Sequence, residues 1–171
     1  MRRILVALLA VALVGCAPAK PAPTPDLQQQ REFAQSLAAL HHDLLAGLDA
    51  YNAWYNSPDR EAAGPEALIA RYHAEWQRLD TLRLRAEALP GCPACDPIRA
   101  DYAASLGVMQ RSLEQAIAYT VTGAPAYRTQ ANQNIDLWVL LRDRAMAALQ
   151  QMLGTEAQSA LAPHAAPSMP Q

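Results

Sequence analysis

The sequence lacks the features that identify several large classes of protein. Lysine occurs once in 171 residues, at Lys20, and the 14 basic residues form no cluster against the 16 acidic ones. Because nucleic-acid-binding surfaces depend on clustered basic side chains, nucleic acid is not an expected partner. No stretch alternates apolar and polar residues with a period of two, so no β-sheet is expected. The chain is therefore predicted to be all-α.

Local signatures of catalysis and of metal binding are also missing. There is no glycine-rich phosphate loop, no nucleophile elbow around a serine and no Glu-x-x-His pair. His41 and His42 are adjacent, and neighbouring residues on a helix point about 100° apart, so they do not readily share a metal. His73 and His164 stand alone. All four are expected at the surface or at the edge of an apolar stripe. The sequence predicts no catalytic residue, no cofactor and no metal site, and we do not expect an enzyme.

The N-terminus has the pattern of an export signal. Met1 is followed by Arg2 and Arg3, and residues 4–14 are apolar. That apolar run is too short for a membrane span of about 20 residues. A positive start, an apolar middle and a small residue before the cut are typical of a signal peptide, here residues 1–15.

The end of this run is more specific. The sequence Leu13-Val14-Gly15-Cys16 resembles the lipobox of bacterial lipoproteins. The resemblance covers residues 1–16 only. It implies cleavage after Gly15, a diacylglycerol on the Cys16 thiol and acylation of the new amino group. By the same resemblance Ala17, in place of Asp, favours the outer membrane, with the protein facing the periplasm. Alternatively, the segment is an ordinary secretory signal and Cys16 is incidental.

Composition divides the rest of the chain. Residues 16–25 contain four prolines after Cys16 and are expected to form an extended tether, which at about 3.1 Å per residue reaches roughly 28 Å from the lipid. Residues 26–154 carry long helical patterns, and residues 155–171, rich in Ala and Pro, are expected to be a flexible tail. One helical domain is therefore predicted between the tether and the tail.

Four segments of this domain, residues 26–54, 65–89, 96–123 and 125–154, repeat apolar residues every three or four positions. Thr24, Pro25 and Asp26 are expected to open the first segment, Asp96 to cap the third and Gly123 to end it. The stretch between Ser57-Pro58 and Gly64-Pro65 is expected to be a loop.

Each apolar stripe must be buried, and short connections make neighbouring helices antiparallel. The prediction is an up-down-up-down four-helix bundle; the rival is three packed helices with the first one sealing a dimer. Asn134 falls either within the last stripe, where it would fix the register, or at its edge in contact with water.

Cys92 and Cys95 lie in the connection between the second and third segments. An exported protein meets an oxidising compartment, so the pair is predicted to form a structural disulfide. A redox role is the less favoured alternative, because redox-active pairs of this spacing follow a strand and here a helix precedes. Zinc is disfavoured because a structural zinc site needs four ligands.

In an up-down bundle, the ends of the first and third helices meet the starts of the second and fourth at one pole, away from the tether. Six of the ten aromatic residues map there: Tyr51, Trp54, Tyr55, Tyr72, Tyr119 and Tyr127. Tyr and Trp suit a partly wet binding surface, although the same rings could instead plug the end of the bundle. We therefore expect a lipid-anchored protein that binds or scaffolds, with an envelope protein or a glycan as partner. An accessory or chaperone-like subunit of an envelope complex is the alternative, followed by a redox or metal-handling protein using Cys92 and Cys95.

The lipobox resemblance makes a direct prediction. Replacing Cys16 with Ser should abolish lipid attachment, because a hydroxyl does not substitute for the thiol in this chemistry. Cells expressing each form are labelled with tritiated palmitate. We expect label in the wild-type protein alone; equal incorporation into the Cys16→Ser variant would contradict the prediction.

Overall fold

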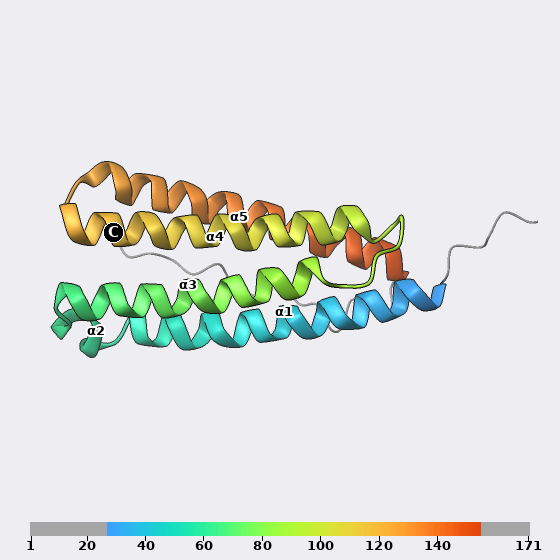
Figure 1. The fold of residues 1–171 in the computed structure, drawn as a ribbon, viewed down its shortest axis with the longest axis horizontal. Helices are drawn as coiled ribbons and strands as arrows, with labels where there is room; N and C mark the ends of the chain where they lie inside the picture. The colour runs from blue at the N-terminus through green and yellow to red at the C-terminus, as the bar shows by residue number, and fades with distance from the viewer. Residues whose placement is uncertain (1–26, 155–171) are drawn as a thin grey trace, which may run out of the picture.

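The computed structural model describes residues 27–154, which form five helices that pack against one another (Figure 1). The four long ones are α1 (Leu27–Tyr55), α3 (Pro65–Glu87), α4 (Asp96–Thr122) and α5 (Pro125–Leu153), and the short α2 spans Pro58–Ala62. No strand is present between residues 27 and 154, which confirms the predicted all-α class. The predicted signal peptide, Cys16, the tether, the residues expected to open α1 and the tail lie outside the described residues.

Proline and glycine set most helix boundaries, as the sequence predicts. Pro65 and Pro125 occupy the first helical position of α3 and α5, where a missing N–H costs no hydrogen bond. Gly123 follows α4 with φ +67°, a left-handed conformation that glycine adopts without strain, and its N–H donates to the Tyr119 carbonyl.

The start of α4 differs from the prediction. Asp96 is the first helical residue, not the cap, and Cys95 precedes it. The Asp96 N–H already donates to the Cys92 carbonyl at 2.9 Å, within the turn that the two cysteines form. The Asp96 carboxylate instead pairs with Arg99 at 2.8 Å. The cysteine turn therefore begins the helix without a side-chain cap.

The stretch between α1 and α3, expected to be a loop, contains α2. Ser57 caps this helix, accepting a hydrogen bond from the Arg60 N–H, and Pro58 takes the first helical position. This one turn of helix fixes the direction in which Arg60 projects, which a flexible loop would leave open.

The core is a single cluster to which every long helix contributes. On α1, Phe33, Leu37 and Leu44 have no exposed surface, because α3 and α5 of the same chain cover them. The rival arrangement, in which the first helix seals a dimer, is therefore unnecessary for burying its stripe. Asn134 is only half-buried and its neighbour Ile135 takes the buried position, so Asn134 lies at the edge of the stripe.

One histidine is placed differently from the expectation. His41 is 7% exposed, and its Nδ1 lies 3.1 Å from the hydroxyl of the fully buried Tyr102 on α4. Burying an imidazole costs free energy unless it finds a hydrogen-bond partner, and Tyr102 supplies one. His42 and His73 are exposed, as predicted.

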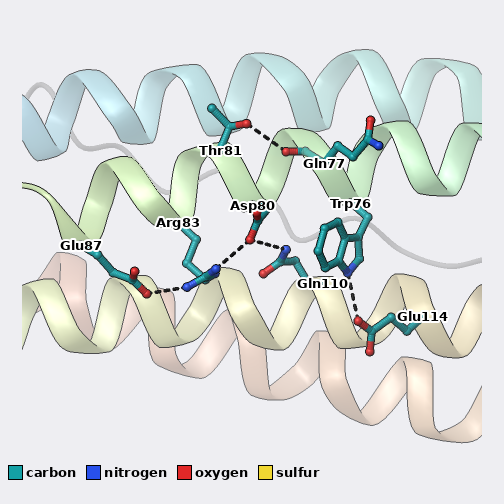
Figure 2. A network of polar contacts seen from close by, with 8 residues as sticks. All are labelled: Trp76, Gln77, Asp80, Thr81, Arg83, Glu87, Gln110 and Glu114. Atoms are coloured by element: carbon teal, nitrogen blue, oxygen red, sulfur yellow. Dashed lines mark hydrogen bonds and ion pairs between the residues drawn. The ribbon is translucent and has the colours of Figure 1, made fainter.

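Polar contacts join α3 to α4 at the surface of the domain (Figure 2). Asp80 of α3 accepts hydrogen bonds from Arg83 at 2.8 Å and from Gln110 of α4 at 3.2 Å, which hold the pKa of its carboxyl below the ordinary value. One turn away, the Trp76 indole N–H donates to Glu114 at 3.0 Å. These bonds fix the register of two helices whose apolar faces alone would permit sliding.

Cys92 and Cys95 form a disulfide, with their Cα atoms 4.9 Å apart. Cys95 has no exposed surface and Cys92 is 7% exposed. Because thiol–disulfide exchange requires an attacking thiolate to reach a sulfur atom, this burial favours a structural role over a redox one.

Within residues 27–154, no helix combines the length and the apolar character needed to cross a membrane.

Candidate functional site

A pocket of about 490 Å³ lies at the end of the molecule where α1 and α4 finish and α3 and α5 begin. This volume falls within the range of about 300–1,000 Å³ typical of small-molecule sites. All five helices, or the residues directly beside them, contribute to the walls. The lining residues are Tyr55, Arg60, Pro65, Leu68, Tyr72, Ala116, Tyr119, Thr120, Gly123, Arg128, Ala131 and Asn132.

Aromatic rings join α1 to α3 beside this pocket. The centre of the Tyr51 ring lies 5.8 Å from the centre of the Trp54 ring and 5.9 Å from that of Tyr55. The Trp54 ring in turn lies edge-on to Tyr72 of α3, with their centres 6.3 Å apart. Such pairs contribute about 0.5–1.5 kcal/mol each beyond the area that they bury. The cluster therefore holds the end of α1 against the start of α3 and gives the pocket a rigid wall.

The structure divides the six aromatic residues predicted for this pole into three groups. Tyr55, Tyr72 and Tyr119 line the pocket, and Tyr119 is the most open of them at 37% exposed. Tyr51 is buried and Trp54 half-buried behind that wall, where they serve packing. Tyr127 is half-buried near the start of α5 and does not line the pocket.

Arginines accompany these rings, and the sequence interpretation missed them. The Arg60 guanidinium lies 4.6 Å from the centre of the Tyr55 ring and 3.4 Å from its hydroxyl, while Arg71 lies 5.4 Å from the centre of the Trp54 ring. A cation over an aromatic face is attracted to it. The sequence does contain a signal for the helix on which Arg60 lies. Ser57 followed by Pro58 is the pattern of a helix cap and a first helical residue, which predicts a helix where a loop was expected.

No acidic side chain within the part of the chain that the structure describes neutralises the positive charge of Arg60. No carboxylate among residues 27–154 lies within ion-pair distance of it, and its buried Nε has no hydrogen-bond partner among those residues. A second hollow, between α3, α4 and α5, provides a contrast: its Arg83 pairs with Asp80 at 2.8 Å and with Glu87 at 2.6 Å. Arg60 therefore has hydrogen-bonding capacity available for an anion, whereas Arg83 has less.

Burial keeps two tyrosines at this end, Tyr51 and Tyr72, protonated. It raises the pKa of both Tyr51 and Tyr72 above the ordinary value of 10.0, and for Tyr72 the nearby charge of Arg60 offsets only part of the effect. Tyr72 is thus a neutral hydroxyl at physiological pH, able both to donate and to accept a hydrogen bond. The pocket offers aromatic rings, hydroxyls and guanidinium N–H groups, which suit the binding of a ligand.

Across the described residues, no group of three or more His, Cys, Asp or Glu side chains is placed to hold a metal ion. No family model, curated protein or solved structure matches the chain, so the chemistry of the pocket carries the functional argument.

The raised tyrosine pKa values predict an alkaline loss of stability. Folded and unfolded tyrosines are both neutral at pH 8. Above about pH 10 the unfolded side chains ionise while Tyr51 and Tyr72 resist, so the free energy of unfolding falls as pH rises, by at most about 1.4 kcal/mol per pH unit for each tyrosine. Urea unfolding at pH 8 and pH 10.5 measures this loss, and Tyr51→Phe should reduce it. An identical loss in the variant, or none in the wild type, would show that Tyr51 titrates normally.

Proposed function

We propose that this chain is a lipid-anchored, non-enzymatic binding protein of the cell envelope, whose pocket at the end of α1 and α4 receives its ligand. The observation that carries the proposal is the pocket itself: three tyrosines and two arginines, supplied by segments distant in sequence, line one cavity of about 490 Å³. A cavity of this size with a few convergent polar groups among apolar walls is typical of a ligand site.

We further propose that the long helices form an up-down-up-down four-helix bundle. The order of contacts supports this arrangement: α1 packs on α3, α3 on α4, α4 on α5 and α5 on α1, so each helix has its sequence neighbour beside it and the last meets the first. The connection between α4 and α5 is very short, which favours antiparallel neighbours.

The proposed anchor and the proposed site fit together. Lipid attachment at Cys16 would place the start of α1 nearest the membrane, since the tether leads into it. α1 has 29 residues, and at 1.5 Å per residue its far end lies about 43 Å away. The pocket would then face away from the lipid, toward the periplasm in an outer-membrane lipoprotein, where envelope glycans and proteins are within reach.

The binding role is tested with Trp54 and Tyr55. Both are half-buried, Tyr55 lines the pocket and Trp54 packs behind it, so changing both to Ala should remove part of the pocket wall and weaken binding more than it lowers stability. Trp76→Ala is the matched control, because Trp76 is also half-buried but contacts Glu114 along α3 and α4.

The measurement is retention of envelope components on immobilised protein, with sugar and protein assayed separately and folding checked by urea unfolding. We expect a component retained by the wild type and by Trp76→Ala but lost from the Trp54→Ala/Tyr55→Ala protein. Equal retention by both variants, or a severe loss of stability with unchanged retention by the folded fraction, would mean that these rings only plug the end of the bundle.

A further inference from the structure

We propose that the ligand of this pocket is an acidic saccharide, a sugar whose carboxylate binds Arg60 and whose ring lies against the tyrosines. This inference rests on the binding function proposed above and names the chemical class of its ligand. It follows from the charge, the shape and the hydrogen-bonding groups of the pocket taken together.

The charge argument begins with Arg60. A guanidinium offers five N–H donors, and among residues 27–154 those of Arg60 face two uncharged tyrosine hydroxyls, that of Tyr55 at 3.4 Å and that of Tyr72. Its Nε is buried and has no partner within residues 27–154. A buried donor left without an acceptor costs free energy, which an anionic ligand would recover. Carboxylates match the planar fork of arginine and bind it through two parallel hydrogen bonds.

The surroundings strengthen this preference. Arg128, in the first turn of α5, adds a second guanidinium to the lining, and no Asp or Glu is among the described residues that line the pocket. The chain as a whole has two more acidic than basic residues, so a lining whose charged residues are both arginines departs from its general composition. Helix dipoles do not account for this excess of arginine in the lining. Two long helices end and two begin at the pocket, so the partial charges of their ends offset one another.

The size and the polarity of the pocket favour a saccharide over a small inorganic anion. The cavity of about 490 Å³ is much larger than a single phosphate or carboxylate group needs, and tyrosines from three different helices border it. Sugars present an apolar face of C–H groups and a rim of hydroxyls, which suit a ring with a polar tip. The Tyr72 hydroxyl, neutral at physiological pH, and the Thr120 and Asn132 side chains can meet those hydroxyls.

The test compares two ligands with the same sugar rings, one charged and one with each carboxylate capped by a methyl group. Full-length protein in detergent micelles is titrated calorimetrically with digalacturonic acid and with its dimethyl ester, which keeps the rings and removes both charges. We expect the acid to bind at least about tenfold more tightly than the ester. Arg60→Gln should weaken binding of the acid by about ten- to a hundredfold, the range for a lost charge-assisted hydrogen bond. Arg128→Gln should weaken it in the same direction.

Arg31→Gln is the matched control, because Arg31 is exposed near the opposite end of α1 and its loss changes the net charge equally. Circular dichroism melting identifies any variant that fails to fold, and the Arg128 and Arg60 variants provide independent tests of the same pocket. Equal affinity for acid and ester would overturn the acidic ligand and leave saccharide binding intact. Full competition by inorganic phosphate at the same concentration would indicate a general anion site and overturn the saccharide. Binding of neither sugar, with envelope retention still dependent on Trp54 and Tyr55, would overturn this inference alone.

Discussion

The structure depends on the burial of α4. This helix packs against both α3 and α5, and eleven of its residues are buried, more than on any other helix between residues 27 and 154. Three of them, Ser105, Gln110 and Ser112, are polar and therefore need partners inside the domain. Gln110 finds Asp80 on α3, and Ser112 donates to the Ala131 carbonyl of α5 at 3.0 Å. A sliding of α4 by one turn would leave the Gln110 and Ser112 side chains unpaired, so these two residues fix the register of its neighbours.

That register determines what meets at the pocket. With α4 fixed, Tyr119 and Thr120 lie opposite the first turns of α3 and α5, and the aromatic cluster of α1 closes the remaining side. The short α2 completes the arrangement by holding Arg60 over Tyr55. Core packing therefore supplies the walls of the pocket, and the single capped turn of α2 supplies Arg60.

Much of the helical layout was predictable, because proline and glycine act locally. Pro65, Pro125 and Gly123 mark boundaries through their own backbone preferences, and the structure has the boundaries there. The predictions for Asp96 and for the burial of His41 were wrong for a common reason. Each was decided by a partner elsewhere, the Cys92 carbonyl for the Asp96 N–H and the Tyr102 hydroxyl for His41, and periodicity contains no information on such pairings.

The candidate site was predictable in its rings and not in its charge. Aromatic residues near helix ends can be mapped to one pole once a topology is assumed. The position of Arg60 depends instead on α2, whose single turn is too short to produce an apolar period. Whether Arg60 forms an ion pair depends in addition on its distance to every carboxylate in the fold, and the sequence does not give those distances.

If Arg60 is the anion-binding group of a ligand pocket, its side chain will contact the ligand, and arginine side-chain NMR detects that contact. Protein labelled with ¹⁵N is titrated with digalacturonic acid while the Nε–H signals are followed. We expect the Arg60 signal to move and saturate along one binding curve, while that of Arg31 stays in place. An Arg60 signal that does not move, or one that drifts together with Arg31 without saturating, would contradict it.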